Sequence, residues 1–144
     1  MTRLVRDIMT KDVITADSRD SIYDVASKMR DNMIGFIPIT QDFRPVGVIT
    51  DRDLVVRGYA EQISYDSPVS EVMTREVITI DDSATAEEAV NIMSENKIRR
   101  LVITEGNRIT GVIAIGDLAV RRVFVDEAGQ ALSDISTPTR QQLQ

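Results

Sequence analysis

The sequence predicts a mixed α/β (α+β) fold in which one β-α-β-β-α unit occurs twice. Three observations support this prediction. Residues recur 64 positions apart without an insertion or deletion, as Asp53 and Asp117 do. Each copy contains short apolar runs and one stretch with apolar residues at helical spacing. The chain is 42% hydrophobic and 28% charged, which is ordinary for a globular protein.

The repeat extends over almost the whole of each copy, so it indicates a duplication and not a shared short motif. All of its pairs have the same separation. They are Val5/Val69, Met9/Met73, Thr10/Thr74, Val13/Val77, Ile14/Ile78, Thr15/Thr79, Asp17/Asp81, Met29/Met93, Asn32/Asn96, Ile34/Ile98, Ile39/Ile103, Thr40/Thr104, Arg44/Arg108, Gly47/Gly111, Val48/Val112, Ile49/Ile113, Asp53/Asp117 and Leu54/Leu118.

Each copy begins with a short turn, a strand and an amphipathic helix. The turns are expected at 5–9 and 69–73, and the strands at 13–15 and 77–79. Ser21-x-x-Asp24 and Thr85-x-x-Glu88 are capping-box patterns, which mark helix N-termini. Apolar residues then follow at i, i+3, i+4 and i+7, the spacing of one helix face. These stripes are Ile22, Val25, Ala26 and Met29, and Ala86, Ala89, Val90 and Met93.

Each copy ends with two strands and a second helix. Strands are expected at 36–40 and 46–50, joined by a turn, and again at 100–104 and 109–114 around Glu105-Gly106-Asn107. The second helix of the first copy is expected from Asp51 to about Arg57, with Gly58 as its stop. One copy has a small sheet with an open face, so two copies are expected to pack face to face.

The predicted domains are repeat 1 at 1–64, repeat 2 at 65–125, and a C-terminal part at 126–144. Residues 59–68 connect the copies, and Asp66-Ser67-Pro68 is typical of a turn. Residues 126–136 are expected to form a short helix that packs on the body or on a second chain. The remaining residues are polar and include Pro138, which is typical of a frayed end.

Composition excludes several classes of function. A net charge of −6 and a pI near 4.7 argue against a nucleic-acid partner. The chain has no Cys and no His, so disulfides, thiolate metal sites and the commonest general base are absent. Carboxylates alone favour Mg²⁺ or Ca²⁺ over zinc as any metal. Neither a signal peptide nor an apolar run of membrane-spanning length is recognised, so no membrane contact and a cytoplasmic location are expected.

The candidate binding motif is Gly47-Val48-Ile49-Thr50-Asp51-Arg52-Asp53-Leu54. A strand leading directly into a helix leaves free N–H groups that favour an anion. Thr50 adds a hydroxyl and Arg52 a guanidinium, while Asp53 is able to accept hydrogen bonds from both hydroxyls of a ribose. Thr50-x-x-Asp53 is also a capping box, which needs no ligand. In the second copy Ala114 has no capping side chain, yet Asp117 is present, and this favours a role for the carboxylate beyond capping.

With these motifs in order twice, the sequence resembles the tandem cystathionine β-synthase (CBS) domain pair, or Bateman module, of the stand-alone bacterial type. The resemblance covers residues 1–125. It implies two repeats packed with pseudo-two-fold symmetry and two clefts that bind AMP, ADP or ATP, or less often S-adenosylmethionine or NAD. It implies regulation of a partner protein and no catalysis, with no tightly bound cofactor and Mg²⁺ only as a companion of the nucleotide. Such modules usually pair, so a homodimer is expected.

The resemblance assigns two unequal clefts. In the first, Thr50 and Asp53 take the ribose, with Arg52 as a further candidate for the phosphate. Arg99 and Arg100 come from the other repeat and hold the phosphate. The residues expected to line the adenine are Ile34, Gly35 and Phe36, with Ile14 and Thr15 nearby. The second, weaker cleft contains Thr79, Ile98, Ala114 and Asp117, and Gly35-Phe36 offers it no basic group.

Two alternative functions remain, a dimer-forming scaffold with vestigial clefts and an enzyme. At the level of single residues, Arg99-Arg100 has the alternative of a solvated pair at a strand edge, and Phe36 that of core packing. An enzyme would need acid–base pairs, and the close carboxylates Asp51/Asp53 and Asp81-Asp82 each have a helix N-terminal explanation. Nothing in the sequence identifies the regulated protein.

Overall fold

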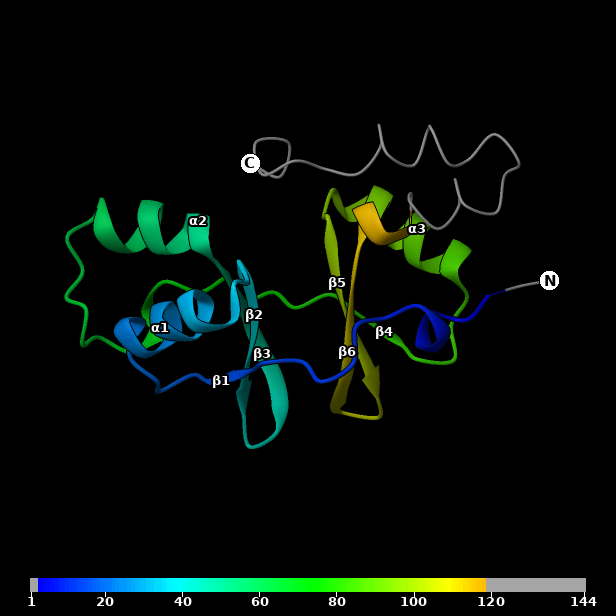
Figure 1. The fold of residues 1–144 in the computed structure, drawn as a ribbon, viewed down its shortest axis with the longest axis horizontal. Helices are drawn as coiled ribbons and strands as arrows, with labels where there is room; N and C mark the ends of the chain where they lie inside the picture. The colour runs from blue at the N-terminus through cyan, green and yellow to red at the C-terminus, as the bar shows by residue number, and fades with distance from the viewer. Residues whose placement is uncertain (1–2, 119–144) are drawn as a thin grey trace.

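A computed structural model describes residues 3–118 of the 144-residue chain and confirms the mixed α+β fold. Two three-stranded sheets lie side by side at the centre, and the helices lie on their outer sides (Figure 1). The first half contains β1 (Ala16–Asp17), α1 (Ile22–Asn32), β2 (Phe36–Gln41), β3 (Arg44–Thr50), α2 (Asp51–Asp53) and η2 (Leu54–Tyr59). The second contains β4 (Thr79–Asp81), α3 (Ala86–Asn96), β5 (Arg100–Glu105) and β6 (Arg108–Ala114).

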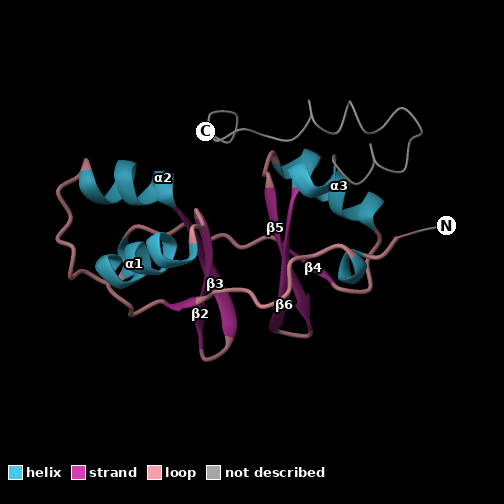
Figure 2. Ribbon diagram, viewed as in Figure 1, coloured by secondary structure: helices cyan, strands magenta, loops and turns pink. Residues whose placement is uncertain are grey.

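Both sheets have the same topology. The strand orders are β1-β2-β3 and β4-β5-β6, and in each sheet the first pair is parallel and the second antiparallel. The register of the long hairpins also repeats, because Phe36 pairs with Thr50 and Arg100 pairs with Ala114. Figure 2 shows the two hairpins facing each other across the centre of the molecule.

The hairpin turns differ between the copies. Asp42 and Phe43 both have positive φ, 52° and 68°, which is the geometry of a type I′ turn. The two-residue turn is tighter than the predicted 41–45 connection, and β3 consequently begins at Arg44. In the second hairpin Gly106 has φ 64°, and Gly at this first central position is typical of a type II′ turn.

The first strand of each sheet lies later in the chain than the sequence predicts. Strands are expected at 13–15 and 77–79, whereas β1 is Ala16–Asp17 and β4 is Thr79–Asp81. The reason is that the chain pairs with the opposite half just before these strands. Thr10 exchanges backbone hydrogen bonds of 2.9 and 3.1 Å with Val112, and Thr74 exchanges two of 2.9 Å with Val48. The following residues cross between the halves and cannot pair earlier.

Each hydrophobic core is completed by a segment from the other copy. The short 3₁₀ turns η1 (Val5–Asp7) and η3 (Val69–Glu71) confirm the predicted opening turns. The first core contains Val69, Val72 and Met73 together with Ala16, Ile22, Val25, Met29, Ile37, Ile39 and Ile49. The second contains Val5 and Ile8 together with Ile80, Ala89, Met93, Leu101, Ile103, Ile113 and Leu118. The boundaries 1–64 and 65–125 therefore describe the sequence repeat, and the cores cross them.

The glycine that opens each binding motif permits this exchange. A Cβ built on Gly47 would lie 2.5 Å from Met73 Sδ and 2.9 Å from the carbonyl oxygen of Thr74. Gly111 has the same relation to Met9. The register of each hairpin shifts just before its glycine, between Ile39/Thr40 and Ile103/Thr104. The motif glycines are thus packing positions, where the exchanged segment presses on the hairpin.

The first helices form largely as predicted. Thr85 and Glu88 make both hydrogen bonds of the capping box at the start of α3. At α1 the Ser21 hydroxyl accepts from the Asp24 N–H, while the reciprocal bond is not among those formed in the described residues, so the predicted box is half made. Both helices end at a residue with φ 55°, Met33 or Lys97.

The second helix of the first copy differs from its prediction. After the single α turn of α2, the chain continues as the wider π-helical η2 to Tyr59, with Ala60 N–H donating to the Val55 carbonyl. Gly58 is buried inside η2 and does not stop the helix. In the second copy a helix begins at Ile115. The predicted helix at 126–136 and the polar tail lie outside the described residues.

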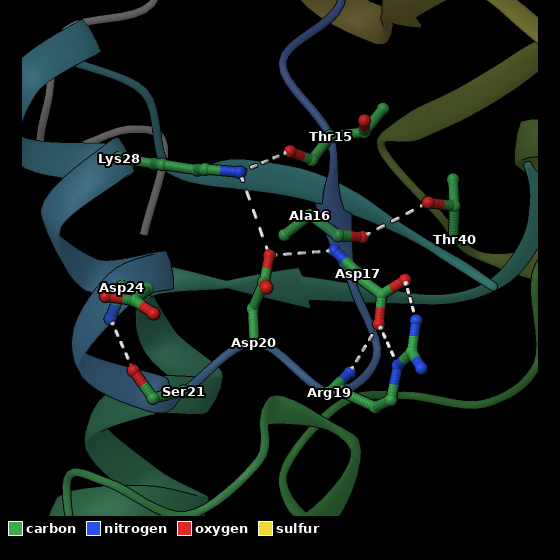
Figure 3. A network of polar contacts seen from close by, with 9 residues as sticks. All are labelled: Thr15, Ala16, Asp17, Arg19, Asp20, Ser21, Asp24, Lys28 and Thr40. Atoms are coloured by element: carbon green, nitrogen blue, oxygen red, sulfur yellow. Dashed lines mark hydrogen bonds and ion pairs between the residues drawn. The ribbon is translucent and has the colours of Figure 1, made fainter.

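A polar network at the entry to α1 explains why an aspartate recurs at 17 and 81 (Figure 3). The backbone N–H and the Nε of Arg19 both donate to Asp17 Oδ1 at 2.9 Å, and this pairing lowers the pKa of Asp17. Ser83 donates to Asp81 through its backbone and its hydroxyl, and lowers the pKa of Asp81 in the same way. Each aspartate therefore holds the turn that precedes the first helix of its half.

Candidate functional site

A pocket of about 340 Å³ lies where the two halves meet. Its lining from the first half comprises Phe36, Val48, Thr50 and Asp53. The second copy of the repeat supplies Thr74, Glu76 and Ile78 from the crossing segment, and Ile98, Arg99, Arg100 and Val102 around the start of β5. The size suits a small organic ligand, and the lining combines apolar walls with carboxylate, hydroxyl and guanidinium groups.

The structure brings together the main residues that the sequence assigns to the first cleft. Thr50 and Asp53 stand at the end of β3, because that strand runs directly into α2. Arg99 and Arg100 stand at the start of β5 in the other half. All four line the same pocket, together with Phe36. The first half thus contributes a carboxylate and a hydroxyl, and the second half contributes two guanidinium groups.

Asp53 caps the helix with one carboxylate oxygen, and its other oxygen faces Arg57 as an ion pair. Its Oδ2 accepts from the Thr50 N–H at 3.0 Å, and Thr50 Oγ1 accepts from the Asp53 N–H at 3.1 Å. Its Oδ1 lies 4.0 Å from Arg57 Nε, outside hydrogen-bonding distance. The capping box is therefore real, and it orients the carboxylate without using both oxygens.

Arg57 is a residue that the sequence-based site prediction does not include. Its Nη1 donates to the Met73 carbonyl and to Thr74 Oγ1, each at 3.4 Å, and its Nε faces Asp53. Arg57 consequently ties the helix that contains Asp53 to the exchanged segment of the other copy. Thr74 itself lines the pocket. The repeat does contain a signal for this residue, because Arg57 recurs as Arg121 and Thr74 recurs as Thr10 at the same 64-residue offset.

Arg100 lies over the aromatic ring of Phe36, with its guanidinium carbon 5.6 Å from the ring centroid. This is the distance of a cation–π contact. The two side chains belong to different halves, and both line the pocket. Phe36 is therefore neither a residue of the buried core nor a simple wall of the pocket, but the neighbour of a pocket cation.

Of the residues expected around the adenine of the first cleft, Phe36 lines this pocket. Ile14, Thr15, Ile34 and Gly35 are not among its lining residues, whereas Ile78 and Ile98 are. Those two are the repeat equivalents of Ile14 and Ile34, so positions of the same type line the pocket from the second copy. The exchange of opening segments brings Ile78 to this pocket, and Ile98, expected in the second cleft, lines it as well.

The structure gives these residues other surroundings. Ile14 and Ile34 pack on the first core. Thr15 accepts a hydrogen bond from Lys28 Nζ through its carbonyl, at 2.9 Å (Figure 3). The Gly35 carbonyl accepts from the Asp51 N–H at 3.0 Å, and a Cβ at Gly35 would lie 2.9 Å from Asp51 Oδ2. Arg52 is exposed and is not among the pocket residues, so its role as a further phosphate contact stays a prediction from the sequence.

The remaining second-cleft residues are not among those that line this pocket. Ala114 is the last residue of β6, and Asp117 follows it in an exposed position. Thr79 is exposed at the start of β4. By the 64-residue repeat, the positions that correspond to Arg99 and Arg100 for this cleft are Gly35 and Phe36, which have no charge.

The described residues contain no group of three or more Asp or Glu side chains placed to hold a metal ion. The Mg²⁺ expected as a companion of the nucleotide stays a prediction. Within residues 3–118, no helix has the length and apolarity needed to cross a membrane.

Comparisons with known proteins agree with this architecture. The model of the CBS domain matches residues 5–58 and 69–129. The CBS domain-containing protein YhcV of Bacillus subtilis (strain 168) is 37% identical over 132 residues, which cover 92% of this chain and 94% of YhcV.

Two solved structures are also similar. The crystal structure of the CBS domain pair of protein MJ0100, in complex with 5′-methylthioadenosine and S-adenosyl-L-methionine, has a TM-score of 0.75 and 28% identity, covering 87% of this chain and 98% of that one. The crystal structure of Hypoxic Response Protein I with two coordinated zinc ions has a TM-score of 0.73 and 30% identity, covering 81% and 96%. With two matched domains and relatives that align over most of its length, this chain belongs to the CBS-domain family.

Proposed function

We propose that this protein binds an adenine nucleotide of the AMP, ADP or ATP class in the pocket between its halves, and that binding modulates a partner protein. One observation supports this proposal above the others. A carboxylate from the first repeat and two guanidinium groups from the second line a single pocket. CBS pair proteins are regulatory ligand-binding modules, and stand-alone members are not catalytic.

Each part of the pocket has a matching part of the ligand. Asp53 Oδ1 accepts hydrogen bonds from the ribose hydroxyls, with Thr50 beside it. The apolar side chains Val48, Ile78 and Ile98 contact the adenine faces. Arg99 and Arg100 hold the phosphate, because guanidinium groups bind phosphate oxygens in pairs and remain charged at all relevant pH values. The protein has a net charge of −6, so this local positive charge is what holds the anion.

The two arginines favour a phosphate-bearing ligand over the uncharged or cationic ones. The ligands named for MJ0100 are 5′-methylthioadenosine, which has no phosphate, and S-adenosyl-L-methionine, whose sulfonium is positive. S-adenosylmethionine is thus a less favoured ligand for this pocket. NAD contains a pyrophosphate, so the arginines do not disfavour it, and it stays a less favoured ligand only because the family binds it less often. The zinc of Hypoxic Response Protein I is not proposed here, because this chain has no Cys and no His. The Ala114–Asp117 cleft is proposed to bind more weakly.

The competing function is that of a dimer-forming scaffold with vestigial clefts. The capping box favours it, because helix N-capping alone accounts for the pairing of Thr50 with Asp53. We also propose a homodimer, since Val55, Val56 and Tyr59 are 59%, 48% and 86% exposed on η2. Light scattering on the purified protein is expected to give twice the chain mass, and a monomer at micromolar concentration would contradict it. A cytoplasmic location stays a prediction from the sequence.

Calorimetric titration of the purified protein with AMP, ADP and ATP, each with and without Mg²⁺, tests the proposed ligand. At least one nucleotide is expected to bind more tightly than adenosine, methylthioadenosine, S-adenosylmethionine, NAD and GMP. At about 100 times its Kd it should stabilise the fold by roughly 2.7 kcal/mol. If no adenine compound binds or raises the Tm at millimolar concentration, the scaffold function replaces this proposal.

A further inference from the structure

We propose that Phe36 is a positioning residue, which holds the Arg100 guanidinium over the pocket so that it is ready to bind the phosphate of the ligand. This inference rests on the proposed function, because it names a residue that acts on the anion through Arg100. It concerns a position that the repeat itself does not explain, since Phe36 and its equivalent Arg100 differ completely in chemistry.

The geometry places the two side chains together at the pocket. The Arg100 guanidinium lies 5.6 Å from the Phe36 ring centroid, and each residue is partly buried. Both line the pocket beside Thr50 and Asp53. Phe36 pairs directly with Thr50 in the β2–β3 ladder, so its ring stands next to the ribose side of the site.

The contact crosses between the halves. Phe36 is the first residue of β2 and Arg100 is the first residue of β5, and the two positions are 64 residues apart in the sequence. In its own hairpin Arg100 pairs with Ala114, on the side of the other cleft. The ring therefore draws the guanidinium of the second half toward the pocket of the first half. The residue at the position equivalent to Arg100 is Phe36 itself, which has no charge to contribute to the other cleft. This difference makes the two clefts unequal.

The physical effect is preorganisation. An arginine side chain has many rotamers, and fixing it on a ligand costs conformational entropy. A ring that attracts the guanidinium removes part of that freedom before the ligand arrives, and it leaves the guanidinium edge free to donate. The benefit applies to a ligand with a phosphate and not to the nucleoside without one. This difference separates positioning from simple packing of the ring against the ligand.

Titrations of AMP and adenosine into four variants test the proposal. Phe36→Leu is expected to weaken AMP binding about five-fold more than it weakens adenosine binding, the size of a partly exposed cation–π contact. Phe36→Tyr keeps the ring and is expected to bind both like the wild type. In the presence of Arg100→Gln, adding Phe36→Leu should cause no further loss, because Phe36 acts through Arg100. Circular dichroism confirms that each variant is folded, and Phe36→Met replaces Phe36→Leu if it is not.

The outcomes distinguish this inference from the proposed function. If Phe36→Leu leaves AMP binding unchanged, or weakens AMP and adenosine equally, the positioning role is wrong while the nucleotide site stands. An additive loss in the Phe36→Leu/Arg100→Gln double variant overturns it as well. If the wild type binds neither AMP nor adenosine, the proposed function fails and the inference fails with it.

Discussion

Replacing Asp53 with alanine is expected to abolish nucleotide binding at the pocket, with at least a hundred-fold loss of affinity. Asp53 lines the pocket, and a hydrogen bond to a charged group contributes about 1.5–3 kcal/mol. Removing the carboxylate takes away the acceptor for both ribose hydroxyls. Calorimetric titration with the best-binding nucleotide measures the change directly, and the nucleotide-dependent rise in Tm should disappear.

The difficulty with Asp53→Ala is that it also breaks the capping box with Thr50. Glu88→Ala is the matched control, because Glu88 has the same place in the complete capping box of α3 and is not among the pocket residues. It is expected to lose about 1 kcal/mol of stability and no affinity. If Asp53→Ala retains nucleotide binding, or if both variants lose it in proportion to their lowered stability, Asp53 serves only as a cap.

Gly47→Ala is expected to destabilise the fold by about 1–3 kcal/mol, as overpacking in a tight core does. The new methyl group would lie 2.9 Å from the Thr74 carbonyl oxygen. This carbonyl cannot easily move away, because the Val48 N–H donates to it at 2.9 Å. The added methyl group would therefore push the exchanged segment off the β2–β3 hairpin. The urea concentration at the midpoint of unfolding is expected to fall as a consequence.

Gly58→Ala provides the control for this prediction. Gly58 lies in η2, and a Cβ there meets no atom within 4 Å. The same change of residue is therefore expected to be neutral or slightly stabilising, since alanine loses less backbone entropy than glycine on folding. Equal stability of Gly47→Ala and the wild type would show that the exchanged segment does not press on Gly47 in solution.

The sequence predicts those features of this protein that depend on local pattern. The hairpins, first helices and opening turns follow from apolar spacing, capping residues and turn residues, and the structure contains all of them. The prediction also names Thr50, Asp53, Phe36, Arg99 and Arg100, which line one pocket. Its error at the end of the second helix has a local cause, the π-helical turns past Gly58, whereas the late starts of β1 and β4 follow from pairing with the opposite half.

Tertiary structure alone decides which copy supplies each wall of the pocket. Ile14 and Ile78 have identical places in the repeat, so no sequence pattern shows which of the two lines a given cleft. Backbone pairing of Thr74 with Val48 takes the second opening segment across to the first half and brings Ile78 to the pocket. Contact between segments far apart in the chain depends on how the two cores close. The repeat determines which residues each copy contains, whereas the packing of the two copies determines which pocket those residues line.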